Sequence, residues 1–83
     1  MYEIIFSKKF LNKLRKLDKN LQERITKVIE RARIRPYSHF ERVIGKRVYK
    51  LRVGDYRIIA DMDKGKLNIL ILDVGHRRNI YKN

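Results

Sequence analysis

The sequence has no cysteine and no tryptophan, and its 83 residues include one proline and four glycines. Without cysteine there is no disulfide framework, no thiolate nucleophile and no zinc site with thiolate ligands. Two isolated histidines cannot complete a metal site by themselves, and no ligand spacing links the aspartates of the C-terminal half. We therefore expect a protein that works without a metal or another cofactor.

Long apolar runs are missing as well. The longest, Ile69–Leu72 and Ile58–Ala60, are far shorter than the roughly 18 residues that a membrane-spanning helix needs. The N-terminus has no apolar segment of the kind found in signal peptides. These absences predict a cytoplasmic protein with no membrane partner.

Acidic residues are scarce: nine Asp and Glu stand against 22 Lys and Arg, which gives a formal net charge of +13. The basic residues divide evenly, eleven in residues 1–41 and eleven in residues 42–83, so the charge belongs to the folded body and not to a tail. Such a charge indicates a polyanionic partner, nucleic acid before an acidic protein. A hydrophobic content of 43% argues against disorder, and the length leaves room for one domain over residues 1–83.

The first half of the chain is typical of a strand followed by a helical hairpin. Tyr2–Phe6 is rich in strand-forming residues, and Ser7 after it is a good helix N-cap. Asp18 is a second N-cap, and Pro36 prevents the second helix from continuing. The apolar stripes that predict the two helices are Phe10, Leu11, Leu14 and Leu17, then Leu21, Ile25, Val28, Ile29 and Ala32.

Residues 36–46 show no clear period, and we expect a connecting loop there. Beyond this segment apolar and polar residues alternate, and Gly54 with Asp55 fits a two-residue hairpin turn between two strands. The turn predicts cross-strand pairs of Val53 with Tyr56, Arg52 with Arg57, Leu51 with Ile58, and Lys50 with Ile59.

A second turn is expected at residues 63–65, followed by a strand over residues 67–74 that ends at Gly75. This strand is apolar at most positions, as in a central strand that is buried on both faces. The order of elements predicts an α+β fold. It consists of an N-terminal strand, a helical hairpin and a three-stranded antiparallel meander, with the helices packed on one face of the sheet.

The predicted register puts Arg52 and Arg57 side by side on the sheet face opposite the core, with Lys50 one pair further along. Like charges at paired positions destabilise a sheet, which is a reason to expect that they bind an anion. The alternative is an ordinary solvated face. Residues 76–78, after the last strand, can add an imidazole and two guanidinium groups to the same concavity. Clustered cations with one histidine indicate a phosphate ligand.

Three other side chains bear on the chemistry. His76 can act as a general acid or base, since histidine has an ordinary pKa of about 6.5; the alternative is a hydrogen-bonded residue at a strand end. Tyr81 can stack on a nucleobase or anchor the tail against the sheet. His39 lies alone in the irregular segment, and we do not expect it in the site.

Two motifs, Tyr49–Ile59 and Ile71–Tyr81, closely resemble the RelE branch of the RelE/ParE toxin superfamily. The opening Ile4–Phe10 and the helical hairpin after it extend the resemblance over essentially the whole chain. The resemblance implies a toxin of a type II toxin-antitoxin pair that enters the ribosomal A site and cuts mRNA there without a metal. It also implies an acidic, RelB-like antitoxin as partner, in addition to the ribosome and mRNA.

On this resemblance Arg57 holds the scissile phosphate and Lys50 is a catalytic lysine. The full set of expected catalytic residues is Lys50, Arg57, His76, Arg77 and Tyr81, and the residues expected to bind RNA phosphate are Arg47, Arg52 and Arg78.

The general base for the 2′-hydroxyl of the RNA is left open between Lys50 and His76. A lysine must lose its proton to act as a base, whereas a histidine ordinarily changes its charge near neutral pH. Two other functions also stay open. The fold is shared with ParE, which poisons DNA gyrase and is not a nuclease. Val48, where some members have a second lysine, leaves room for an inactive basic RNA-binding domain.

Overall fold

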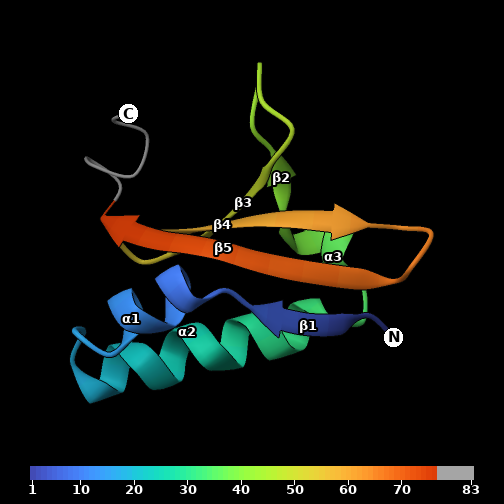
Figure 1. Cartoon of the computed structure of the whole chain (residues 1–83). Coiled ribbons are helices and arrows are strands. Elements are labelled where there is room, and N and C mark those ends of the chain that lie inside the picture. The colour runs from blue at the N-terminus through green and yellow to red at the C-terminus, as the bar shows by residue number, and fades with distance from the viewer. Residues whose placement is uncertain (77–83) are drawn as a thin grey trace.

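The chain folds into one mixed sheet with its two longer helices on one face, in a computed structural model that describes residues 1–76 (Figure 1). The elements are β1 (Glu3–Phe6), α1 (Lys8–Leu14), α2 (Lys19–Ala32), α3 (Pro36–His39), β2 (Glu41–Arg42), β3 (Tyr49–Val53), β4 (Tyr56–Asp63) and β5 (Asn68–His76). The described strands form a five-stranded sheet in the order β1-β5-β4-β3-β2. Only the β1–β5 pair in it is parallel. The expected α+β class, with a meander after the helical hairpin, is confirmed.

The first two helices begin where the sequence predicts. Ser7 accepts a hydrogen bond from the N–H of Phe10 at 3.0 Å and donates one to the carbonyl of Leu72 at 2.8 Å, so it caps α1 and also ties this helix to β5. Asp18 caps α2 by accepting a hydrogen bond from the N–H of Leu21 at 2.9 Å. Such caps satisfy backbone donors that a helix leaves without an internal partner.

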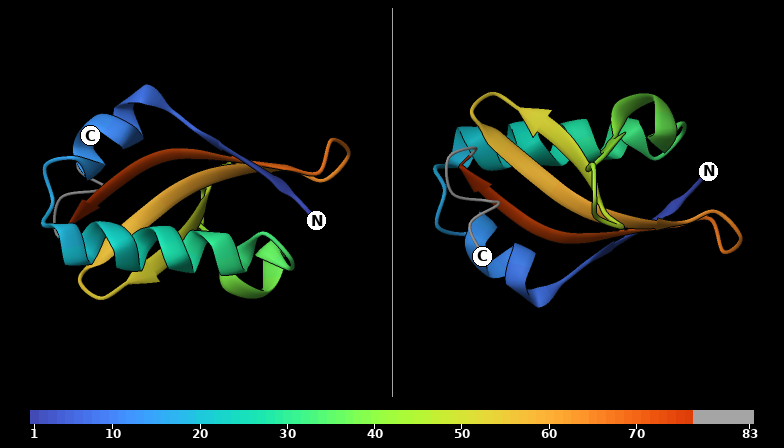
Figure 2. Two further views of the ribbon diagram at one scale, coloured as in Figure 1. Left: turned by 90° about the horizontal axis from the view of Figure 1, so that it is seen from below. Right: turned by 90° about the horizontal axis from the view of Figure 1, so that it is seen from above.

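The core lies between the helices and the covered face of the sheet. Ile25, Ile29 and Ala32 follow one side of α2 at helical spacing and are completely buried. The buried side chains of the strands are Leu51, Val53, Ile58, Ala60, Ile69, Ile71 and Val74. Burying one large aliphatic side chain stabilises a fold by about 1.5–3 kcal/mol. In the view from above in Figure 2, β3 and β4 cross in front of α2, so the face of these two strands that is turned away from α2 has no helix over it.

The β3–β4 hairpin has the predicted register. Val53 pairs with Tyr56, and the next pairs are Arg52 with Arg57, Leu51 with Ile58, and Lys50 with Ile59. Gly54 has φ +59 in the turn, a conformation that L-residues with a side chain rarely adopt. This glycine therefore fixes the register that determines which side chains reach the open face.

The connecting loop expected at residues 36–46 is wrong in part. Pro36 starts the four-residue helix α3, and Glu41 and Arg42 form the two-residue strand β2, which pairs with β3. The missing N–H of proline costs nothing in the first turn of a helix. Neither element is long enough to complete a helical or an alternating pattern, so the sequence shows no period there.

The last strand differs from its prediction at both ends and on one face. β5 starts at Asn68, because Leu67 has φ +53 in the turn, and it continues through Gly75 to His76. A β-bulge opposite Ile59 and Ala60 changes the alternation of buried positions along β5. Burial on both faces is wrong, since Leu70 is 36% exposed on the face that no helix covers.

Candidate functional site

A cavity of about 210 Å³ opens on the uncovered face of the sheet, where β3 lies between its two neighbours. Residues from α3 and from three strands line it: His39, Glu41, Lys50, Leu51, Arg52 and Arg57. Its charged groups are three cations and one carboxylate. The cavity therefore attracts an anion, and its carboxylate adds a group that can accept a proton.

Arg52 and Arg57 are the cross-strand pair at the centre of this site. Residues paired in this way have Cβ atoms about 4.5–5.5 Å apart, so two guanidinium groups share a small part of the surface. Arg52 is exposed, whereas Arg57 is half-buried and its Nε atom is inaccessible to solvent. A half-buried guanidinium is held in place by its surroundings and is suited to bind a phosphate in a fixed orientation.

Lys50 faces a carboxylate that the sequence analysis did not consider. Glu41 is its cross-strand partner in the β2–β3 pair, and its Oε2 atom lies 3.9 Å from Nζ of Lys50. The side chain of Lys50 is 31% exposed and that of Glu41 is 78% exposed, so this ion pair borders the open mouth of the cavity. The ion pair holds the ammonium group of Lys50 near the arginines.

Two functional candidates, His39 and Glu41, are therefore missing from the set that the sequence predicts. Both lie in the segment without a clear period, where His39 stands alone. A two-residue strand cannot be recognised from alternation, so nothing in the sequence indicates that Glu41 pairs with Lys50. The one available signal is that Glu41 is an isolated acid, next to Arg42, in a strongly basic chain.

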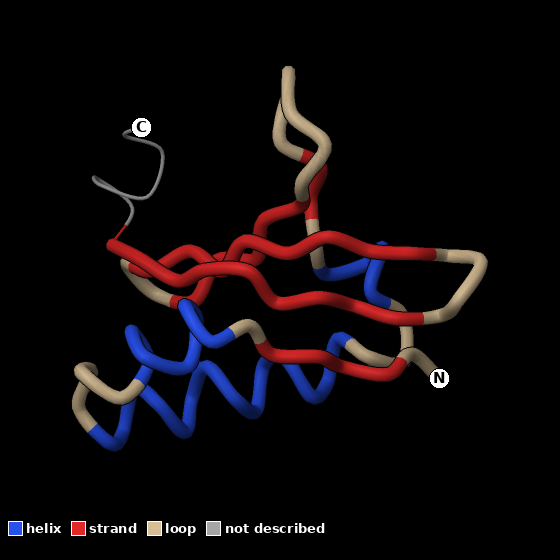
Figure 3. The backbone as a smooth tube through the Cα atoms, viewed as in Figure 1, coloured by secondary structure: helices blue, strands red, loops and turns tan. Residues whose placement is uncertain are grey.

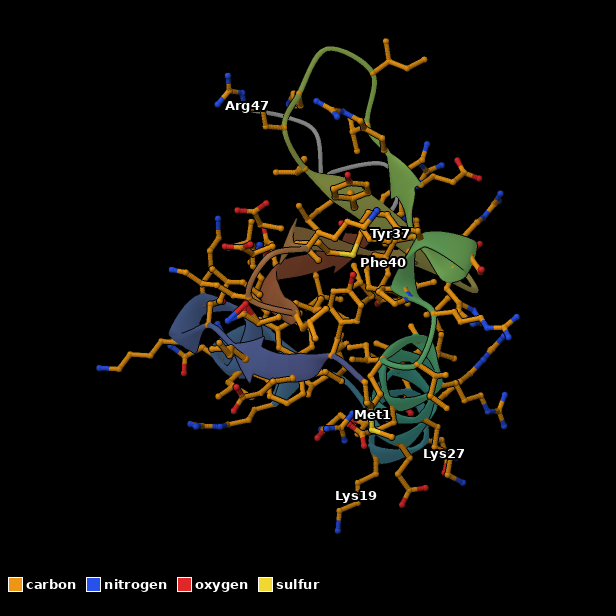
Figure 4. The ribbon with its side chains drawn as sticks, turned by 90° about the vertical axis from the view of Figure 1, so that its right-hand side faces the viewer. Met1, Lys19, Lys27, Tyr37, Phe40 and Arg47 are labelled. Atoms are coloured by element: carbon orange, nitrogen blue, oxygen red, sulfur yellow. The ribbon has the colours of Figure 1, made fainter. Side chains whose placement is uncertain are left out.

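An aromatic cluster holds α3, and with it His39, against the sheet. The Tyr37 ring meets the rings of Tyr49 and Tyr2 edge-on, at centroid distances of 5.6 and 6.3 Å. Phe40, next to His39, is only 4% exposed and anchors the end of the helix in the core (Figure 4). Partial desolvation raises the pKa of the Tyr37 phenol above its ordinary value of 10.0, and its neighbours Tyr49 and Tyr2 add to the shift, although the residue as a whole is still 45% exposed.

His76 lies at the end of β5 and does not line this cavity. It pairs across the strands with Tyr56, and the two rings meet edge-on with centroids 5.6 Å apart. Gly75, the residue before it, is the partner of Arg57. Because successive side chains point to opposite faces of a sheet, His76 shares the side of Tyr56 and not that of Arg57.

The other expected site residues lie elsewhere. Arg47 is exposed in the loop between β2 and β3, outside the lining of the cavity. Arg77, Arg78 and Tyr81 lie outside the described residues. Within those residues, the cavity thus brings together Lys50, Arg52 and Arg57 from the expected set.

Two aspartates of the C-terminal half, Asp63 and Asp73, have structural partners in the described part of the chain. Asp63 accepts a hydrogen bond from the N–H of Lys66 at 3.1 Å in the turn after β4. Asp73 forms ion pairs with Lys13 at 2.9 Å and Lys9 at 3.3 Å, which hold α1 against β5. Within residues 1–76 no three acidic or histidine side chains are grouped to hold a metal ion. No helix in this range is long and apolar enough to span a membrane.

The fold and the basic cavity define a small, basic α+β protein with a candidate anion site, and comparison with known families gives its class. A family model described as the ParE toxin of the type II toxin-antitoxin system, parDE, matches residues 4–81. The chain belongs to this toxin family, within the RelE/ParE superfamily. No curated protein sequence matches the chain.

Solved structures of RelE-type complexes have the same fold. A chain of the RelBE toxin-antitoxin complex of Escherichia coli is 21% identical, with a TM-score of 0.79 over 92% of this chain and 96% of that chain. For the RelBE2 complex of Mycobacterium tuberculosis the identity is 22% and the TM-score 0.81, over 92% of this chain and 98% of that chain. For the RelB-RelE complex of Methanococcus jannaschii they are 26% and 0.73, over 93% and 94%. The expected RelE-like fold is confirmed.

Proposed function

We propose that this toxin is a metal-independent endoribonuclease that cuts mRNA in the A site of the translating ribosome, and that residues 1–83 act as one toxin domain. The observation that carries the proposal is the convergence of Lys50, Arg52 and Arg57 with Glu41 around one cavity of about 210 Å³. A gyrase inhibitor that performs no chemistry does not need a carboxylate beside three cations. Cleavage of RNA by its own 2′-hydroxyl needs both a proton acceptor and positive charge at the phosphate.

The proposed reaction uses only groups of the RNA and the protein. The 2′-oxygen attacks the adjacent phosphorus, so that a bond from the 2′-oxygen to phosphorus forms and the bond from phosphorus to the 5′-oxygen breaks. A base takes the proton of the 2′-hydroxyl, and an acid gives a proton to the leaving 5′-oxygen. Arg57 binds the non-bridging oxygens, and Arg52 adds charge as the phosphorane develops. We propose that Arg77, Arg78 and Tyr81 complete the site from the C-terminal segment.

Three groups are candidates for the base. Lys50 and His76 are the two that the sequence suggests, and Glu41 is the one that the cavity adds. Carboxylates are ordinarily ionised at neutral pH and can accept a proton without first losing one. Glu41 is therefore our preferred base. The Nζ atom of Lys50 lies 3.9 Å from Oε2 of Glu41, and this lysine is placed to stabilise the negative charge that develops on the RNA.

Substitution of Arg57 tests the proposal. Translating ribosomes that are incubated with the wild-type chain should yield mRNA cut in the A-site codon. Arg57→Ala should lower the cleavage rate by about 100-fold or more, the usual cost of removing a group that stabilises the transition state. Arg31→Ala removes the same charge from the exposed side of α2 and is the control.

The fold of the Arg57→Ala variant should survive, because the change removes a repulsion with Arg52 on the uncovered face. A melting temperature well below that of the wild type would show that Arg57 has a structural role instead. Equal cleavage by both variants would contradict the assignment of Arg57, and no cleavage by the wild-type chain would reject the nuclease.

The family match itself favours a second candidate function. Because the matching family model is that of the ParE toxin, inhibition of DNA gyrase is the alternative. The same preparation should then cause gyrase-dependent DNA breaks while mRNA on ribosomes stays intact. An Arg57→Ala variant that still inhibits gyrase would separate the two functions cleanly.

We also propose an acidic, RelB-like antitoxin as the partner that keeps the toxin inactive. The solved relatives are toxin-antitoxin complexes, and the charge of +13 favours an acidic protein. Ile5 and Leu70, which pair across β1 and β5 on the uncovered face, are 42% and 36% exposed, and they offer such a partner apolar contact.

A further inference from the structure

A narrow loop projects from the sheet between β2 and β3, away from the helices (Figures 1 and 3). We call residues 42–48 the β2–β3 finger. Its base adjoins the candidate site, because Glu41 precedes it and Lys50 follows shortly after it. A hollow of about 350 Å³ is lined by residues 42–47.

Backbone hydrogen bonds give the finger a defined shape. The N–H of Val43 donates to the carbonyl of Val48 at 2.9 Å, and the N–H of Lys46 donates to the carbonyl of Val43 at 3.1 Å. Gly45 has φ +80 at the turn and has open space around it. The finger is therefore a closed hairpin turn that can present side chains in a fixed arrangement.

The side chains of the finger are basic at its sides and apolar at its tip. Arg42, Lys46 and Arg47 are exposed, and the segment contains no acid. Within residues 1–76 neither Arg42 nor Arg47 takes part in an ion pair, whereas Lys9 and Lys13 of α1 are paired with Asp73. Ile44 is 98% exposed, the most exposed of the large hydrophobic side chains in this part of the chain.

This pattern has no role in the core or in the cavity. An isoleucine held almost fully in water by a well-formed turn contributes nothing to folding. A solvated loop does not need an aliphatic tip between cations. The combination is that of an element that lays cations along the phosphates of a duplex while its tip rests in a wide, shallow groove, such as the minor groove of double-stranded RNA.

We propose that the β2–β3 finger is a docking element for double-stranded RNA, separate from the site that would cut the message. The inference rests on the proposed action on RNA, and it adds that the toxin holds a folded RNA through this finger while the cavity receives the single strand. Single strands are bound mainly by stacking on aromatic rings, and residues 42–48 include none. One exposed isoleucine is too little apolar surface for a protein interface, which buries about 800 Å² on each partner.

Binding of a labelled RNA hairpin to the full chain, measured across a series of salt concentrations, tests the proposal. The variant Arg42→Gln/Arg47→Gln should lower the slope of log affinity against log salt by about 2, or nearly 1 for each lost phosphate contact. Lys19→Gln/Lys27→Gln removes the same charge from α2, at the opposite end of the molecule from Arg47 (Figure 4), and should leave the slope almost unchanged.

A third variant separates charge from apolar contact. Ile44→Ser should weaken binding of the hairpin roughly tenfold without changing the salt slope, because it removes buried apolar area and no charge. Unchanged melting temperatures of all variants show that the fold is intact, as expected for exposed positions.

The outcomes distinguish this inference from the proposed function. Equal salt slopes for the two double variants would overturn the docking role, whatever the cleavage assay shows. The same loss on a DNA duplex of the same sequence would assign the finger to DNA, and a loss confined to antitoxin binding would assign it to a protein. Finger variants that bind the hairpin weakly, in a protein that cuts no mRNA, would sustain the docking role and reject the nuclease.

Discussion

Glu41 is the residue of the cavity that we propose as the general base, and substitution by glutamine tests this role alone. A glutamine side chain keeps the size and an oxygen for Lys50 but cannot accept a proton, so Glu41→Gln should slow single-turnover cleavage by roughly 100- to 10,000-fold. Affinity for RNA should not fall, because a negative charge is lost. Glu23→Gln, on the exposed side of α2, is the matched control.

If Lys50 and not Glu41 is the base, the substitutions Glu41→Gln and Lys50→Met should have the opposite effects on cleavage. In that case Glu41→Gln would retain nearly full activity, while Lys50→Met would lose the cleavage step. Should both variants remain active, the proton must go to a group outside the cavity, and His76 becomes the next residue to substitute.

The raised pKa of the Tyr37 phenol predicts how the stability of the fold changes at alkaline pH. Partial desolvation, followed by the neighbouring Tyr49 and Tyr2, raises the pKa of its phenol above 10.0, so the folded chain favours the protonated form. Its contribution to stability is therefore complete below pH 10.0 and is lost as the pH rises through the higher folded pKa. Tyr37→Phe should lack this loss.

The measurement for Tyr37 is the difference in melting temperature between wild type and Tyr37→Phe on both sides of pH 10.0. The difference should shrink or reverse at the higher pH, and the ultraviolet absorbance of tyrosinate should show that the wild type has one additional late-titrating phenol. Parallel stability curves for the two proteins would contradict the assignment.

The β3–β4 hairpin is the element on which the site depends, and its turn can be tested through two glycines. Gly54→Ala should destabilise the fold by about 1–2 kcal/mol, because alanine is strained at φ +59. For a domain of this size that lowers the melting temperature by roughly 4–8 °C for each kcal/mol. Gly65→Ala, in the β4–β5 turn and outside the left-handed region, should be nearly neutral.

Gly54→Ala should lower the cleavage activity as well as the stability, because a hairpin that shifts by one residue moves Arg52 and Arg57 to the covered face. Added Cβ atoms meet no tight contact at either position, the nearest atoms being 3.5 Å away at Gly54 and 3.4 Å at Gly65. Equal stability of the two variants would therefore mean that the turn at Gly54 is not the strained one.

Elements long enough to complete a period were predictable from the sequence. The stripe through Ile25 and Ile29 indicates α2, and the turn at Gly54 determines the register of the arginine pair. The four residues of α3 and the two of β2 are held by packing and by pairing with a distant strand, which no local pattern records. Glu41 was missed for that reason, although three of the expected cations do share the cavity.

The prediction that β5 is buried on both faces was wrong for a different physical reason. Leu70 is apolar, and apolar residues in a strand ordinarily indicate that a layer of the protein covers them. Here Leu70 pairs with Ile5 of β1 at the uncovered side, and both remain over one-third exposed. An apolar pattern indicates that a surface favours burial. It does not indicate whether residues of the same chain bury that surface.

At the scale of the whole molecule, the charge of +13 and the exposed apolar residues at β1 and β5 predict how a partner binds. An acidic antitoxin should associate quickly and in a salt-sensitive manner, since screening weakens long-range attraction. Apolar contact with Ile5 and Leu70 should then slow dissociation. Because the partner binds the folded chain alone, it should stabilise that chain by ~2.7 kcal/mol when free partner is present at 100 times its dissociation constant.

The measurement is a melting curve of the toxin with and without the acidic product of a neighbouring gene, together with the mRNA cleavage assay. Leu70→Ser should speed dissociation of the complex at every salt concentration, whereas higher salt alone should slow association. Glu3→Gln, an exposed change on β1, serves as the control for general surface effects. A gene product that neither raises the melting temperature nor suppresses cleavage is not the antitoxin, and a complex that Leu70→Ser leaves unchanged must be held through another face.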